Sequence, residues 1–105
     1  MRNYVQLVGH LGGDPELHET KTGKQTARFS LATNSFYTND KGERVESTVW
    51  HRVTGWNRTA TMMSDKLAKG ARCLVEGRLD YRKYEDKEGI TRYYTEIVAS
   101  RFLAL

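Results

Sequence analysis

Residues 45–69 read VESTVWHRVTGWNRTATMMSDKLAK, and this stretch decides the fold. Its first part, Val45 to Trp56, is rich in β-branched and aromatic residues, which predicts a strand. Its second part, Asn57 to Lys69, places Met63 and Leu67 four residues apart, which predicts a short amphipathic helix with a narrow apolar stripe. The chain is therefore expected to pass directly from a strand into a helix.

Strand-like segments separated by turn residues flank this stretch on both sides. Polar residues 38–43 predict a flexible hairpin tip between the second and third strands, and charged residues 80–90 predict a projecting hairpin between the last two strands. The flanking strands are Asn3–Leu11, Thr26–Asn34, Ala71–Leu79 and Thr91–Phe102.

Five strands with one helix between the third and the fourth are the order expected of an oligonucleotide-binding (OB) barrel. The number of strands alone would also suit an SH3-like barrel or a small sandwich, and the position of the helix favours the OB barrel. We therefore expect residues 1–105 to form a single all-β domain, a five-stranded OB-fold β-barrel with one short α-helix between strands 3 and 4.

The chain has 105 residues, with 17 Lys and Arg against 13 Asp and Glu, and a formal net charge of +4. This excess suits a polyanionic partner such as nucleic acid, although an ordinary solvated surface can carry as much charge. Cys73 is the single cysteine and lies in an apolar run, which predicts a buried thiol in a reducing compartment. No apolar signal core or membrane-spanning stretch is visible, so we expect a cytoplasmic, nucleoid-associated protein with no membrane partner.

Catalytic chemistry is not indicated by any motif. The three histidines are dispersed and lack the spacing of metal ligands. No nucleophile elbow occurs, and no glycine run leads into the Gly-Lys-Ser/Thr of a phosphate-binding loop. We therefore predict no enzyme activity, no catalytic residue, no metal and no cofactor.

The third strand carries two tryptophans beside an arginine. Trp50, Arg52, Thr54 and Trp56 stand at alternate positions and so share one face of the strand. An unpaired arginine is costly to bury, which favours an exposed face. Exposed flat rings stack on unpaired bases, and cations neutralise phosphates, so this face suits single-stranded nucleic acid. The opposite arrangement, with both tryptophans in the core and Arg52 at an edge, stays open at this point.

Two further clusters combine aromatic and basic residues. Arg78 to Tyr84 (RLDYRKY) interleaves the two types on the projecting hairpin, which is typical of a surface that follows a nucleic-acid strand. Arg92 with Tyr93 and Tyr94 is expected to extend the same surface, although one ring of a tyrosine pair on a strand usually faces inward. The pair Phe36-Tyr37 begins the other hairpin, where the polar residues that follow favour exposure of at least one ring.

Six short segments match the pattern of one family in order along the chain. They are Val8–Glu16 (VGHLGGDPE), Phe29–Thr33 (FSLAT), Glu46–Val53 (ESTVWHRV), Leu67–Gly70 (LAKG), Val75–Leu79 (VEGRL) and Arg82–Tyr84 (RKY). With these motifs the sequence resembles the bacterial single-stranded DNA-binding protein family over essentially its whole length. The resemblance implies an OB fold that binds and protects single-stranded DNA, independently of sequence, in DNA replication, recombination and repair.

The resemblance also implies site residues. Two of the implied stacking residues are tyrosines where many members carry tryptophan, and Trp56 stands where phenylalanine is frequent. The implied base-stacking residues are Tyr37, Trp50, Trp56 and Tyr84, and the implied phosphate contacts are Arg52, Arg58, Lys69, Arg82, Lys83 and Arg92.

The resemblance further implies a homotetramer in which the first strand and His51 lie near subunit contacts. Family members usually continue into a flexible linker and an acidic tip that recruits replication and repair enzymes. This sequence ends at Leu105, as either a trimmed domain or a tailless member. We therefore expect replication and repair proteins as partners only if an acidic tail exists beyond this chain.

Two other binding functions are compatible with an OB barrel. A primosomal OB-fold scaffold protein uses a similar barrel between proteins and DNA, but a scaffold needs fewer exposed rings than the four implied here. RNA chaperones of the cold-shock type are usually shorter and concentrate their aromatic residues in paired motifs. The four aromatic positions favour single-stranded DNA binding over both alternatives.

Overall fold

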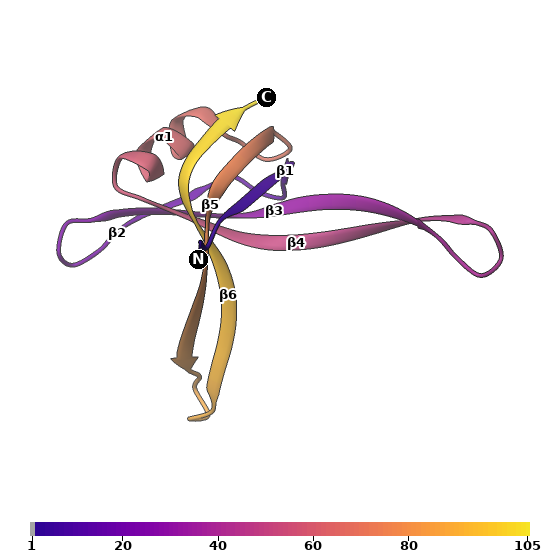
Figure 1. Cartoon of the computed structure of the whole chain (residues 1–105). Coiled ribbons are helices and arrows are strands. Elements are labelled where there is room, and N and C mark those ends of the chain that lie inside the picture. The colour runs from indigo at the N-terminus through magenta and orange to yellow at the C-terminus, as the bar shows by residue number, and fades with distance from the viewer. Residues whose placement is uncertain (1) are drawn as a thin grey trace.

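A computed structural model describes residues 2–105, and within this range the chain forms six strands and one helix (Figure 1). The helix of this range is neither long nor apolar enough to cross a membrane. In chain order the elements are β1 (Val5–Leu11), β2 (Glu16–Glu19), β3 (Gln25–Thr38), β4 (Arg44–Trp56), α1 (Arg58–Lys66), β5 (Arg72–Glu85) and β6 (Thr91–Ala104).

The strands form a closed barrel. They follow the order β1-β5-β6-β4-β3-β2 in one sheet, and a further antiparallel pairing of β1 with β3, at His10 and Ala32, closes it. β4 and β6 pair in parallel, with Val53 opposite Ile97. Closure pairs strand edges that would otherwise expose free N–H and C=O groups. The predicted OB-fold barrel is confirmed, with α1 between the third and fourth of the predicted strands.

The core lies inside the barrel and under α1. Leu31, Val53 and Val75 are fully buried there, and Met63 joins them from the helix. A Cβ on Gly55 would lie 2.6 Å from the Met63 sulfur, so a larger residue here would displace the buried Met63 side chain where the helix packs against β4. Cys73 is also fully buried, and burial raises the pKa of its thiol.

The helix is shorter than predicted. It ends at Lys66 rather than Lys69, because Leu67 adopts an extended conformation (φ −114°, ψ 147°) that lets its side chain enter the core. Gly70 then turns the chain with a φ of +84° and donates its N–H to the Leu11 carbonyl at 2.8 Å. This hydrogen bond ties the end of the helical segment to β1.

β2 was not predicted. This short strand pairs with β3, with Leu17 opposite Ala27, and all four of its side chains are exposed. A strand without a buried face has no alternation of apolar and polar residues, so its sequence carries no strand signal.

Two ribbons extend well beyond the barrel, and they are the β3–β4 arm and the β5–β6 arm (Figure 1). The β3–β4 arm is paired out to Thr38 opposite Arg44, and the β5–β6 arm out to Glu85 opposite Thr91. Each turn is closed by an acidic or amide side chain: the Asp86 carboxylate, for example, accepts the N–H of Ile90 at 2.9 Å. The predicted hairpins are therefore present as long paired arms, and they stretch the domain to 55 Å.

Candidate nucleic-acid interface

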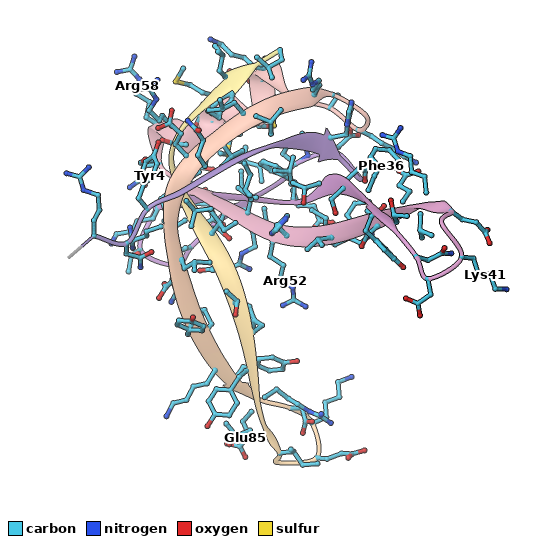
Figure 2. The ribbon with its side chains drawn as sticks, turned by 45° about the vertical axis from the view of Figure 1, so that its right-hand side comes forward. Tyr4, Phe36, Lys41, Arg52, Arg58 and Glu85 are labelled. Carbon is cyan, nitrogen blue, oxygen red and sulfur yellow. The ribbon has the colours of Figure 1, made fainter. Side chains whose placement is uncertain are left out.

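The two arms leave the barrel in different directions, and a groove of about 530 Å³ lies on the barrel surface next to them. Figure 2 shows Arg52 pointing from β4 into the angle between the arms. The groove is lined by Gly12, Gly13, Asp14, Glu16, Arg28, Phe29, Ser30, Trp50, Arg52, Val53, Thr54, Tyr94 and Glu96.

The outer face of β4 is open only in part: Trp50 and Arg52 are exposed, whereas Thr54 is buried and donates its hydroxyl to Glu96. Trp50 and Arg52 line the groove, and Trp50 is 60% exposed, so the arrangement that buries both tryptophans in the core is wrong. Trp56 shares this face but is half-buried beside Thr26 and does not line the groove. On the inner face, the His51 ring nitrogen Nε2 lies 2.8 Å from the Thr33 hydroxyl, and burial lowers the pKa of His51. His51 is therefore a neutral hydrogen-bonding residue near pH 7.

A row of contacts links the groove to the β5–β6 arm. The Arg52 guanidinium lies over the Tyr94 ring, 4.7 Å from its centroid. The Tyr94 ring is 5.9 Å from the Tyr84 ring at an interplanar angle of 57°. A cation over a ring is worth about 0.5–1 kcal/mol at an exposed site, enough to bias the Arg52 side chain towards the arm. The row places a cation and two rings along one path.

Arg82 holds the arm to the barrel. Its Nε donates to Glu96 at 2.9 Å and lies 3.3 Å from Asp80. Glu96 is only 3% exposed, and its other carboxylate oxygen accepts the Thr54 hydroxyl at 2.9 Å. The hydrogen bond to Glu96 is the main cause of the raised pKa of Arg82. A buried carboxylate needs such partners, so Arg82 has a structural task beside any contact with phosphate.

Arg92 is also paired within the arm. Its Nε donates to Asp86 at 3.0 Å, close to the tip. The backbone N–H of Ile90 and then the Arg92 guanidinium lower the pKa of Asp86. Arg82 and Arg92 are therefore both paired with carboxylates.

Of the six predicted phosphate contacts only Arg52 lines the groove. Arg58, Lys69 and Lys83 are exposed, and no ion pair forms to them within residues 2–105. Arg58 stands at the start of α1, where Figure 2 shows it on the barrel and away from the angle between the arms. The backbone N–H of Lys69 donates to Asp14, beside the glycines of the groove. The structure thus places Arg58 and Lys69 on the barrel and Lys83 on the β5–β6 arm, and it does not gather these cations.

Tyr37 and Trp50 lie on opposite faces of the β3–β4 arm. The pairs Ala32–Trp50 and Phe36–Glu46 occupy one face of the ladder, whereas Tyr37 opposite Val45 occupies the other. Both rings at the start of the hairpin are exposed, Phe36 at 54% and Tyr37 at 55%. The Arg44 guanidinium covers the Phe36 ring at 4.1 Å. The ladder therefore gives the Trp50 face a different ring, Phe36, from the one that the motif pattern selects.

Two groove residues are missing from the site residues that the resemblance implies, although Tyr94 belongs to a cluster that the sequence had singled out. Arg28 on β3 stands opposite Thr54 and supplies a second cation to the groove. Tyr94 carries the contact with Arg52. The signal for Arg28 was its position between core residues Ala27 and Phe29, which turns its side chain outward. Only the strand register shows that this outward side is the groove.

Gly12 leaves room for the Trp50 indole. A Cβ on Gly12 would lie 2.6 Å from Cζ3 of Trp50. We therefore expect Gly12→Ala to displace the exposed ring and to weaken ligand stacking by about 1 kcal/mol, while the core stays intact. Binding titrations and thermal melts of the variant test this expectation. Gly13→Ala is the matched control, since no atom of the described residues lies within 4 Å of a Cβ at Gly13. Equal binding by both variants would contradict the positioning role of Gly12.

The comparisons with known proteins agree with this geometry. The model of the single-strand binding protein family matches residues 2–105. Among solved structures, the Plasmodium falciparum SSB complex with ssDNA superposes with a TM-score of 0.90 at 32% identity, covering 100% of this chain and 96% of that one.

Curated relatives point to the same family. The chain is 42% identical to single-stranded DNA-binding protein 1 of Chlorobaculum tepidum over 93% of its length. It is 39% and 40% identical to the single-stranded DNA-binding proteins of Neisseria meningitidis and Xanthomonas campestris over 98% of its length. The chain spans only 59% to 61% of the length of these three relatives. With the family model matched from residue 2 to residue 105, the chain belongs to the single-strand binding protein family.

Proposed function

We propose that this chain binds single-stranded DNA without sequence preference and protects it in DNA replication, recombination and repair. The observation that carries the proposal is the groove face of β4, where Trp50 is 60% exposed next to Arg52. An exposed aromatic ring can stack on the base of a nucleotide, and a cation beside it can neutralise the phosphate. The names of the relatives and the ssDNA complex of the Plasmodium falciparum protein support this proposal. Nothing in the proposed activity requires catalysis, and we propose a binding protein rather than an enzyme.

The proposed site residues fall into two groups. Bases stack on exposed rings, and phosphates lie against cations that the arms and the barrel present. Arg52 lines the groove, whereas the paired Arg82 and Arg92 contribute less free charge. The stacking residues are Tyr37, Trp50, Trp56 and Tyr84, and the phosphate contacts are Arg52, Arg58, Lys69, Arg82, Lys83 and Arg92.

A titration with oligothymidylate at several salt concentrations tests the proposal. Binding is expected to quench tryptophan emission, because Trp50 is exposed on the proposed surface. The logarithm of the affinity should fall linearly with the logarithm of the salt concentration, since bound cations release counterions from the strand. A mixed-sequence strand should bind about as well and a duplex much more weakly. Unchanged emission at saturating oligonucleotide would contradict the proposal.

A homotetramer is part of the same proposal. On the outside of the barrel, Val8, Leu74 and Leu103 stand side by side across β1, β5 and β6. Val8 is 43% and Leu103 58% exposed, so this row leaves apolar surface open. Such a row suits contact between copies of the chain, and a molar-mass measurement in solution tests it. A monomer at all concentrations would contradict this part.

The primosomal scaffold is less well supported than single-stranded DNA binding. The three curated relatives are all named for single-stranded DNA binding. The exposed rings along both arms also exceed what a scaffold needs.

A further inference from the structure

The β5–β6 arm has two faces with different side chains. Residues alternate along each strand, and the register places Tyr81 opposite Thr95 and Lys83 opposite Tyr93. These four residues therefore share one face. Tyr94, which contacts Arg52, belongs to the other face with its partner Arg82. We call the first the far face and the second the groove face.

The far face carries the two most exposed large rings of residues 2–105. Tyr81 is 74% and Tyr93 75% exposed, compared with 52% for Tyr84 on the groove face. Tyr81 and Tyr93 are diagonal neighbours on the ladder, with Cβ atoms at most about 7–8 Å apart. Neither ring has a hydrogen bond or a ring partner within residues 2–105, whereas Tyr84 and Tyr94 contact each other. Two adjacent open rings form a platform and not a scattered pair of surface residues.

The far face also carries a free cation of the arm. Arg82 and Arg92 on the groove face are paired with carboxylates. Lys83 stands directly opposite Tyr93, and no ion pair forms to it within residues 2–105. Glu85 occupies the same face closer to the tip, where Figure 2 shows it at the end of the arm. A polyanion is therefore expected to lie over Lys83, on the barrel side of Glu85.

We propose that Tyr81 and Tyr93, with Lys83, form a second base-stacking site for single-stranded nucleic acid, so that a bound strand passes around the arm from its groove face to its far face. This inference rests on the proposed function and extends the path of the bound nucleic acid beyond the groove. Lys83 and Tyr84 are neighbours in the sequence and point to opposite faces of the arm. Because the arm is only two β-strands wide, a nucleic-acid strand bound at Tyr84 can reach the far face by passing around its edge.

A second copy of the chain fits this face less well. Stable protein interfaces bury about 800 Å² on each partner. Two tyrosine rings and one lysine on a narrow two-stranded ribbon offer much less than that. By contrast, single-stranded nucleic acid can contact all three side chains, with a base stacked on each ring and a phosphate at the lysine.

The test compares two oligothymidylates with the double variant Tyr81→Ala/Tyr93→Ala. The short strand has about 8 nucleotides, within the range for one OB fold, and the long strand is about three times that length. We expect the variant to bind the short strand like the wild type, because the groove is unchanged. We expect it to bind the long strand about fivefold or more weakly, since a lost stacking contact costs at least about that factor. The variant Tyr81→Phe/Tyr93→Phe keeps the rings and should bind both strands like the wild type.

Direct crosslinking gives a second readout on the unaltered protein. With iodouracil placed along the long strand, ultraviolet crosslinks are expected on Tyr81 or Tyr93 as well as on groove residues. Wild-type affinity of the alanine variant for the long strand, or crosslinks confined to the groove, would overturn the far-face site. A change in molar mass of the alanine variant would instead assign the face to contact between copies. If the wild type fails to bind even the short strand, the proposed function itself is wrong.

Discussion

Replacing Trp50 with alanine is expected to weaken single-stranded DNA binding by about 1–3 kcal/mol, or roughly 5- to 150-fold in Kd, because one base loses its stacking surface. The fold should persist, since the ring is 60% exposed and lies outside the core. The free energy of unfolding is therefore expected to stay within about 0.5 kcal/mol of the wild-type value, as for most surface substitutions. Anisotropy titrations at fixed salt and denaturant melts measure the two quantities.

Val49→Ala is the matched control for this prediction. Val49 precedes Trp50 on β4, is 49% exposed and points to the opposite face. It should leave both the affinity and the stability nearly unchanged. If Trp50→Ala unfolds the protein, or binds as tightly as the wild type, the stacking role of Trp50 is refuted.

The second large effect concerns the ion pair between the arm and the barrel. Arg82→Met is expected to lower the free energy of unfolding by about 1.5–3 kcal/mol, the range for hydrogen bonds to charged groups. Within residues 2–105, the variant leaves the buried Glu96 carboxylate with the Thr54 hydroxyl as its one side-chain partner. The expected loss in the free energy of unfolding is smaller than for a fully buried ion pair, because the Arg82 side chain is 45% exposed. Lys83→Met, on the far face and without an ion pair, should cost almost nothing.

A double-mutant cycle with Glu96→Gln isolates this pair. The Glu96 substitution should cost less in the Arg82→Met background than in the wild type, with a coupling of about 1–2 kcal/mol. Additive losses would show that the two side chains do not support each other. The salt dependence of binding separates the structural role from a phosphate contact. Arg52→Gln should reduce the slope by about 1, whereas Arg82→Met should change it less, because two carboxylates already neutralise Arg82.

Sequence patterns predicted the face of a strand on which a side chain lies wherever one face is buried, because burial imposes an alternation on the sequence. The alternation in β4 placed Trp50 and Arg52 on one face, and the cost of burying an arginine favoured its exposure, as the structure shows. The same alternation could not reveal β2 or the full length of the arms. Their side chains face solvent on both sides, so burial imposes no period on the sequence.

Pairing between distant strands decided the composition of the candidate site. Arg28 enters the groove because β3 aligns it with Thr54, and Tyr94 enters because β6 brings it under Arg52. The resemblance implied both Arg82 and Lys83 as phosphate contacts. In the folded arm they occupy opposite faces, and a buried carboxylate from another strand holds Arg82.

The sequence by itself determined the barrel, the place of its helix and the membership in a family, because local periodicity and ordered motifs carry that information. Only the tertiary structure decided which cations are free, which rings share a face and where the groove lies. These properties depend on register and on ion pairs between strands far apart in the chain, and a one-residue change of register would move every side chain to the other face.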